Sequence, residues 1–202
     1  MIIEVKNVSK SFQGKKVLDN FSLNIEDEHA YVITGPQGCG KTTLMRLILK
    51  LDTPDEGRVG LLGDYKYPYI NAGVVFQEDR LVESLDALTN ITMVSKKIFR
   101  QTVAEELFKF LPEEALKVPV RKLTDSQRRI IAIIRACSIP SDVLIMDEPF
   151  AGLDRDTKLK LIPYIRNIQG KGSLTIFTRD TEDLDFARII SLPQLLEGAA
   201  SE

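Results

Sequence analysis

The chain has 202 residues, 44% of them hydrophobic and 28% charged, with a formal net charge of −2. This length suits one large domain, and so balanced a charge favours no nucleic-acid partner. No apolar stretch approaches the roughly 20 residues that span a bilayer, the N-terminus lacks a secretory signal pattern and the two cysteines form no disulfide framework, so we expect a cytoplasmic protein.

The N-terminal part contains three strand-like segments. Residues 2–8 and 16–25 flank a turn at Gln13 and Gly14, a pattern that predicts an antiparallel hairpin. Residues 30–34 form a short apolar run that predicts a buried strand.

A phosphate-binding loop follows this strand. Residues 35–42 match the pattern G-x-x-x-x-G-K-[ST], and residues 41–51 carry apolar side chains at the spacing of one helical face. The glycines let backbone N–H groups point inward around a phosphate at the positive end of the helix. Lys41 would then reach the outer phosphates and the Thr42 hydroxyl would bind magnesium. The alternative is a Gly-rich turn without a ligand.

Strands and helices alternate over the rest of the chain. We expect strands over 57–62 and 72–76, on either side of a Tyr/Pro-rich loop at 65–69, and then a small helical layer over 86–116. Further expected elements are a helix over 126–137, a strand over 143–146, a helix over 155–168, a strand over 173–178 and a loose acidic tail after Pro193. This alternation favours an open, mainly parallel sheet.

The strand over 143–146 ends in two acids, Asp147 and Glu148. A carboxylate at the carboxyl end of a strand can hold magnesium opposite Thr42, which makes Asp147 the candidate metal ligand. Glu148 lies one residue further, where a carboxylate could orient and deprotonate an attacking water. The alternative is an acidic pair that merely ends a strand.

These motifs, in this order, resemble the ATP-binding subunits of ABC transporters over nearly the whole chain. Residues 74–77 are similar to the family's Q-loop, residues 151–154 to its D-loop, and residues 127–136 to the helix after its signature sequence. Residues 75–81 and 146–150 together are similar to importer subunits of the nitrate, sulfonate and taurine type.

The resemblance implies an α/β fold with a RecA-like P-loop NTPase core, a mainly parallel sheet, an N-terminal antiparallel β layer and a short helical subdomain over about 86–123. The whole chain, 1–202, would form this single domain. It further implies ATP and Mg²⁺ as cofactors, ATP hydrolysis, and partnership with a second ATP-binding subunit, identical or different. The other implied partners are a transmembrane permease at the inner face of the cell membrane and, for an importer, a solute-binding protein.

The resemblance also assigns site residues. Phe12 stands where the family places an aromatic residue that stacks on adenine, although packing is an alternative role. The assigned sets are catalytic Lys41, Gln77, Glu148 and Arg179; ATP-binding Phe12, Val17, Gly35, Pro36, Gln37, Gly38, Cys39, Gly40, Lys41, Thr42 and Thr43; signature Thr124, Asp125, Ser126 and Gln127; D-loop Asp154; and magnesium-binding Thr42, Gln77 and Asp147.

Two motifs depart from the family. Its signature Leu-Ser-Gly-Gly-Gln is replaced by residues 123–127, in which Thr124 keeps a hydroxyl but Asp125 sets a carboxylate toward phosphate. That repulsion is on the order of 1 kcal/mol per charge pair in water. Arg179 replaces a histidine and can bind phosphate but relay no proton. His29, the only histidine, is expected at the surface.

These departures leave alternatives open. In a head-to-tail pair of chains, Asp125 of one and Arg179 of the other could form an ion pair, or the two motifs could have decayed independently. The chain could therefore be an ATPase that drives a permease, a regulatory subunit that binds ATP but turns it over little, or a soluble P-loop enzyme such as a small-molecule kinase.

Overall fold

The computed structural model describes residues 2–63 and 69–193. The chain divides into two compact units, unit 1 with residues 1–71 and 171–202 and unit 2 with residues 72–170. Except for Tyr69, the loop expected at 65–69 and the tail after Pro193 lie outside the described residues. The single-domain organisation stays a prediction.

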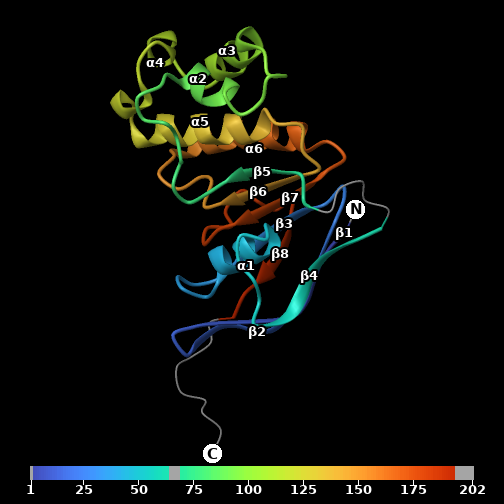
Figure 1. Ribbon diagram of the computed structural model, residues 1–202. Helices are drawn as coiled ribbons and strands as arrows, with labels where there is room; N and C mark the ends of the chain where they lie inside the picture. The colour runs from blue at the N-terminus through green and yellow to red at the C-terminus, as the bar shows by residue number, and fades with distance from the viewer. Residues whose placement is uncertain (1, 64–68, 194–202) are drawn as a thin grey trace, which may run out of the picture. The chain divides into compact units, whose positions relative to one another are not determined.

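The elements follow the order expected from the sequence (Figure 1). Unit 1 contains β1 (Ile2–Phe12), β2 (Lys15–Glu26), β3 (Ala30–Thr34), α1 (Lys41–Ile48), β4 (Glu56–Leu62), β7 (Ser173–Phe177) and β8 (Arg188–Ser191). Unit 2 contains β5 (Ala72–Val75), α2 (Ala87–Thr92), α3 (Arg100–Phe108), α4 (Glu113–Leu116), the 3₁₀ helix η1 (Val120–Lys122), α5 (Asp125–Cys137), β6 (Val143–Asp147) and α6 (Arg155–Gln169).

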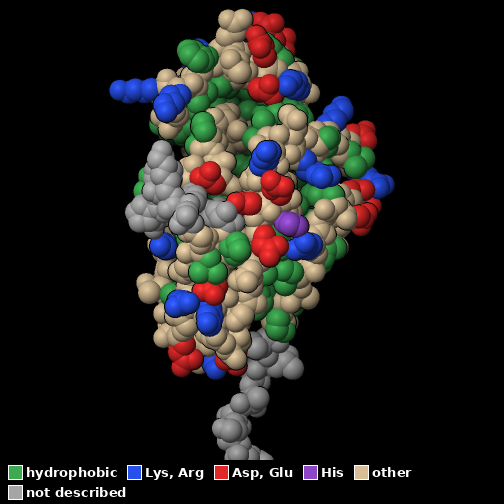
Figure 2. Space-filling model, turned by 90° about the vertical axis from the view of Figure 1, so that its right-hand side faces the viewer, with side chains coloured by type: hydrophobic (Ala, Val, Ile, Leu, Met, Phe, Trp, Pro, Cys, Tyr) green, Lys and Arg blue, Asp and Glu red, His purple; other side chains and the backbone are tan. Residues whose placement is uncertain are grey.

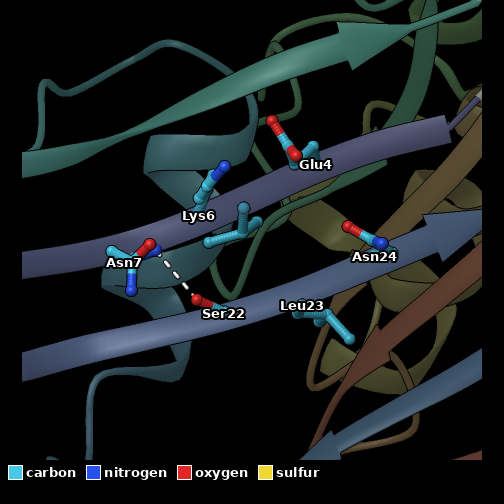
Figure 3. A pocket seen from close by; sticks show the side chains of 7 residues that line it. Glu4, Lys6, Asn7, Ser22, Leu23 and Asn24 are labelled. Atoms are coloured by element: carbon cyan, nitrogen blue, oxygen red, sulfur yellow. Dashed lines mark hydrogen bonds between the residues drawn. The ribbon is translucent and has the colours of Figure 1, made fainter.

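The predicted hairpin opens an antiparallel sheet of unit 1, in the order β2-β1-β4. Its inward side chains, among them Ile3 and Val5, are buried. The register between β1 and β2 shifts between Val5 and Val8, and in this irregular stretch the Asn7 N–H donates to Ser22 Oγ at 2.8 Å. A hollow of about 370 Å³ lies at this stretch (Figure 3). None of the predicted site residues lines it.

The second sheet segment of unit 1 is parallel, and β3 lies between β7 and β8. Its strand β7 is buried throughout, whereas β8 is largely exposed. The sequence did not predict β8, because a strand of four residues with little apolar burial gives only a weak pattern. Helix α1 ends earlier than expected, since Lys50 takes a left-handed φ of 55° and Leu51 is left half-exposed.

Unit 2 pairs β5 and β6 in parallel under helices (Figure 1). Helix α5 lies between this strand pair and the short helices α2, α3 and α4. Strand β5 and helix α5 approach so closely at Gly73 that an added Cβ would lie 2.4 Å from the Ala136 carbonyl oxygen. The helical layer expected over 86–116 consists of three separate helices, and Phe99 and Pro112 take an extended conformation at the two breaks between them.

The surface carries both signs of charge, and on the face drawn in Figure 2 acidic and basic side chains are interspersed. His29 has a side chain 38% exposed, which confirms the predicted surface histidine, and its Nδ1 lies 2.8 Å from the Asp27 carbonyl oxygen. Over residues 2–63 and 69–193, no helix has the length and apolar character needed to cross a membrane.

Candidate functional site

The phosphate loop of unit 1 joins β3 to α1 through three glycines with positive φ. At Gly35 a Cβ would lie 2.6 Å from both Cys39 Sγ and the Leu192 carbonyl oxygen, and at Gly40 it would lie 2.9 Å from Val17 Cγ1. Only glycine fits at these two positions. Gly38 has open space around it and needs glycine for its φ of 81° alone. Val17, predicted to contact ATP, therefore lies against the loop.

The cationic group at this loop belongs to Lys41. Its side chain is buried, and Nζ donates to the carbonyl oxygens of Gly35 at 2.7 Å and Pro36 at 3.2 Å. Its Nζ also lies 3.9 Å from the buried Cys39 Sγ. The ammonium is thus held inside the curl of the loop, next to the backbone that would surround a phosphate.

Helix α1 begins without a capping side chain. Its N-cap residue is Gly40, which carries no side chain to accept a hydrogen bond from the first-turn amides. These amides and the helix dipole together place partial positive charge at the loop. Thr42 and Thr43 lie in this first turn, and Thr42 is exposed. The arrangement suits a phosphate group.

Arg179 lies in the same unit, two residues after β7. The Thr178 N–H donates to the Ile33 carbonyl at 3.1 Å, so the pairing of β7 with β3 extends to the residue before Arg179. Because β3 leads into the phosphate loop, Arg179 follows a strand adjacent to that of the loop. Arg179 is exposed. Phe12 is the last residue of β1 and is 46% exposed, and Lys10 Nζ lies 5.4 Å from the centroid of its ring.

In unit 2 the acidic pair ends strand β6, as predicted. Asp147 is buried and is the last residue of a strand that is buried throughout. Glu148 follows with a φ of 46°, a left-handed conformation that costs energy for any residue except glycine. Such strain concentrates at functional positions, and here it falls on the residue predicted to be the base.

The signature turn, residues 123–127, is held by side chains. Thr124 is the N-cap of α5: its Oγ1 accepts from the Gln127 N–H at 3.2 Å, and its own N–H donates to Gln127 Oε1 at 3.0 Å. Asp125 is exposed and forms an ion pair with Arg128 of the same helix. The Ser126 hydroxyl donates to the Gly152 carbonyl at 2.8 Å, which links the signature turn to the D-loop.

The D-loop leads directly into α6 through Asp154. This carboxylate accepts from the Thr157 N–H at 2.9 Å and from the Thr157 hydroxyl at 2.7 Å. Both hydrogen bonds hold the pKa of Asp154 below its usual value. Asp154 thus acts as the N-cap of α6, a role that its family assignment alone did not predict.

Gln77 lies in the segment after β5 and is exposed. The backbone of this segment is held from α5 by Arg129 and Arg135, which donate to four of its carbonyl oxygens. Sequence reasoning assigned neither arginine to a site. The sequence nevertheless marks both residues: Arg129 directly precedes an apolar run over 130–137, and Arg135 is the one charged residue within that run.

The described residues fit ATP and magnesium. No group of three or more His, Cys, Asp or Glu side chains among residues 2–63 and 69–193 could hold a metal ion by itself. Magnesium in nucleotide-binding proteins needs only one or two protein ligands, because phosphates and water supply the rest. The exposed Thr42 hydroxyl and the Asp147 carboxylate are hard oxygen donors of the required kind.

Comparison with known proteins identifies the family. The family described as ABC transporter matches residues 18–151. The sulfate/thiosulfate import ATP-binding protein of Pseudomonas syringae is 33% identical over 91% of this chain and 61% of its own length. The spermidine/putrescine import ATP-binding protein of Spiroplasma citri is 34% identical over 90% of this chain and 55% of its own length. The chain therefore spans little more than half the length of these relatives.

Solved structures agree. A dimeric post-hydrolysis state of an ATP-binding cassette bound to ADP and phosphate has a TM-score of 0.82 and 28% identity, covering 95% of this chain and 94% of that one. A dimeric bacterial ABC transporter cassette has a TM-score of 0.79 and 30% identity, covering 94% of each chain. These structures confirm the predicted α/β, RecA-like P-loop fold. With most of the chain matched in sequence and nearly all of it in fold, this protein belongs to the ABC transporter family.

Proposed function

We propose that this chain binds ATP and Mg²⁺, dimerises on ATP and hydrolyses it to power a membrane permease. The phosphate loop carries the proposal, because its glycines, the held Lys41 ammonium and the uncapped start of α1 all suit a polyphosphate. Two of the matched structures are dimeric, and one of them holds ADP and phosphate.

Each unit supplies its own residues to this chemistry. In unit 1, the loop amides and Lys41 would hold the phosphates, Thr42 would bind magnesium, and Arg179 would contact the γ-phosphate. In unit 2, Asp147 would bind magnesium and Glu148 would take a proton from the attacking water, with Gln77 sensing the metal. Catalysis would then consist mostly of positioning and of stabilising the developing charge.

The proposed partners are a second ATP-binding subunit and a transmembrane permease, which would hold the chain at the inner face of the cell membrane. We propose import as the direction, because the named relatives import sulfate or thiosulfate and spermidine or putrescine. A solute-binding protein would then deliver the solute. Within the importers, residues 75–81 and 146–150 favour the nitrate, sulfonate and taurine type.

Phosphate release by the purified chain tests hydrolysis. The wild-type chain should release phosphate from ATP only when Mg²⁺ is present. Glu148→Gln should abolish release but keep ATP binding, since it removes the base and leaves the phosphate loop unchanged. Equal release by the wild type and Glu148→Gln would contradict hydrolysis at this site.

The second candidate function is a regulatory subunit that binds ATP with little turnover. The exposed carboxylate of Asp125 in the signature turn favours it, because it would repel the phosphates held by a second subunit. Arg128 offsets part of that charge within the same helix. ATP-dependent dimerisation without phosphate release would favour this second function over the first.

A further inference from the structure

We propose that Arg129 and Arg135 are positioning residues that fix the Q-loop segment, residues 76–80, to helix α5 and thereby set the orientation of Gln77. The inference rests on the proposed function, in which Gln77 senses magnesium. The two arginines, the segment and the helix all belong to unit 2.

Arg129 holds the start of the segment. Its guanidinium is buried and donates through Nη1 to the Phe76 carbonyl at 2.8 Å and through Nη2 to the Gln77 carbonyl. Its Nε lies 3.2 Å from Asp79 Oδ1. One planar cation therefore contacts two consecutive carbonyls and a carboxylate of the same short segment. The two carbonyls belong to the peptide units before and after the Gln77 Cα, so holding both fixes the planes on either side of that atom and the direction in which the Gln77 side chain leaves the backbone.

Arg135 holds the end of the segment. It lies six residues further along α5, and its Nη1 and Nη2 donate to the carbonyls of Arg80 and Asp79, both at 2.8 Å. Arg80 in turn stacks on the Phe76 ring, with its Cζ 3.6 Å from the ring centroid. The first and last residues of the segment therefore contact each other, and both ends of the segment are attached to helix α5.

These contacts need arginine. A guanidinium presents several N–H groups in a fixed fork, whereas a lysine ammonium is a single point charge that would reach one carbonyl of each pair. Burial raises the pKa of Asp79, while the nearby Arg129 charge opposes that rise. The Arg129 charge therefore favours the ionised form of this partly buried carboxyl, against the effect of burial.

The attachment has a mechanical consequence. Helix α5 begins at the signature turn, where Thr124 caps it, and it carries Arg129 one turn later. Any movement of the signature turn that carries α5 with it would displace the Q-loop backbone by the same rigid motion. Gln77 would then respond to magnesium only while the two forks are intact.

The test uses Arg129→Lys and Arg135→Lys in the full chain, with Arg100→Lys as the matched control. Arg100 also forks onto partners within unit 2, Thr89 Oγ1 and Asp86 Oδ2, both at 3.2 Å, but contacts no residue of the Q-loop segment. One readout is hydrogen exchange of the amides of residues 76–80 without nucleotide. The other is the ratio of ATP affinities measured with Mg²⁺ and with EDTA, which requires no hydrolysis.

For Arg129→Lys we expect exchange in the segment to rise about tenfold, as loss of a charge-assisted hydrogen bond predicts. The Mg²⁺-dependent part of ATP affinity should fall about fivefold or more, while affinity in EDTA stays constant because the phosphate loop is untouched. Arg135→Lys should produce a smaller change in the same direction, and Arg100→Lys none. If Arg129→Lys fails to fold, hydrogen exchange and the Mg²⁺ effect can still be measured on the milder Arg135→Lys variant.

Faster exchange with an unchanged Mg²⁺ effect would overturn the inference, since the arginines would then be structural only. Unchanged exchange in both variants would also overturn it. In either case a wild type that binds ATP more tightly with Mg²⁺ leaves the proposed function standing. A wild type that binds no ATP under either condition would overturn the proposed function and, with it, the inference.

Discussion

Helix α1 in unit 1 and helices α2, α5 and α6 in unit 2 begin in different ways. Helix α1 starts at Gly40 with no capping side chain, whereas Asp86, Thr124 and Asp154 cap the other three. A capping oxygen consumes an amide that a ligand could otherwise use. The comparison teaches that three helices of unit 2 use a side-chain oxygen at their start to build the fold, whereas α1 begins at a glycine that leaves the space beside its first turn without a capping side chain.

The signature turn shows what this difference means for recognition. The signature expected from the family resemblance has two glycines there, and Asp125 and Ser126 stand at those two positions. Thr124 Oγ1 accepts the cap hydrogen bond, which leaves its own hydroxyl hydrogen able to donate to a phosphate. We infer that recognition of nucleotide by this turn depends on side chains, in contrast to the backbone recognition of the phosphate loop.

Among the changes proposed, Gly35→Ala should disrupt the phosphate loop most strongly. The new Cβ would lie 2.6 Å from the Leu192 carbonyl oxygen and from Cys39 Sγ, so the loop must move. We expect a loss of stability of about 3 kcal/mol, typical of severe overpacking, together with loss of ATP binding. Chemical denaturation and nucleotide titration measure the two effects.

Gly14→Ala is the matched control for this change. Gly14 also has a positive φ, 80°, but no atom lies within 4 Å of the added Cβ. Only the backbone cost of about 1 kcal/mol should appear, with ATP binding intact. Equal effects of the two substitutions would mean that the packing around Gly35 has no special role.

The signature turn is tested next by Asp125→Gly, which introduces the glycine of the expected family signature. Removal of a carboxylate facing phosphate should favour ATP-driven dimerisation by about 1 kcal/mol, or roughly fivefold. Ultracentrifugation of Glu148→Gln protein with ATP measures the dimer. A decrease in dimerisation would show that Asp125 contributes a favourable contact.

Arg179→His, combined with Asp125→Gly in a double-mutant cycle, tests whether the two residues pair between copies. A coupling energy above about 0.5 kcal/mol in the dimerisation constant supports the pair. The ion pair of Asp125 with Arg128 inside one chain competes with it. If the two substitutions changed the dimerisation free energy additively, the pairing between copies would be ruled out and Arg128 would be the partner of Asp125.

Ser126→Ala tests the link between the signature turn and the D-loop. It removes the hydrogen bond to the Gly152 carbonyl, so the signature turn and the D-loop lose their direct link. We expect a loss of stability of about 1 kcal/mol, the usual net value of one hydrogen bond. Thermal unfolding measures it. Retention of full stability by Ser126→Ala would show that water replaces the hydroxyl at no cost.

The sequence contains the local pattern of the phosphate loop but not the contacts that hold the signature turn, for a physical reason. Glycine, lysine and threonine in the phosphate loop act through fixed local spacing, and a strand and a helix flank them in sequence. The links of Ser126 to Gly152 and of Arg129 to Gln77 join residues 26 and 52 positions apart. The sequence of α5 marks Arg129 as a cation next to an apolar run, but which residue it meets depends on how α5 packs, and no local pattern contains that. The strain at Glu148 was equally invisible, because it is a backbone conformation.

The smallest expected effect concerns the cap of α2 and its pH dependence. Burial acts to raise the pKa of Asp86, but hydrogen bonds from Thr89 and Arg100 outweigh it and hold that pKa below its usual value. A lowered pKa means that the charge of Asp86 stabilises the fold above the unfolded pKa of about 3.9, and that this contribution is lost as pH falls through the folded pKa.

Asp86→Asn isolates this charge, because asparagine caps a helix about as well as aspartate does. After allowance for solvent screening, we expect it to lower the free energy of unfolding by only about 0.5 kcal/mol at pH 7. Urea unfolding should show this difference shrinking as the pH falls below 4, since the wild-type carboxylate is then protonated as well. If the difference persisted at low pH, where Asp86 carries no charge, the effect would lie in the cap geometry of α2 and not in the charge. The start of α1 offers no such test, because its N-cap is a glycine with nothing to titrate.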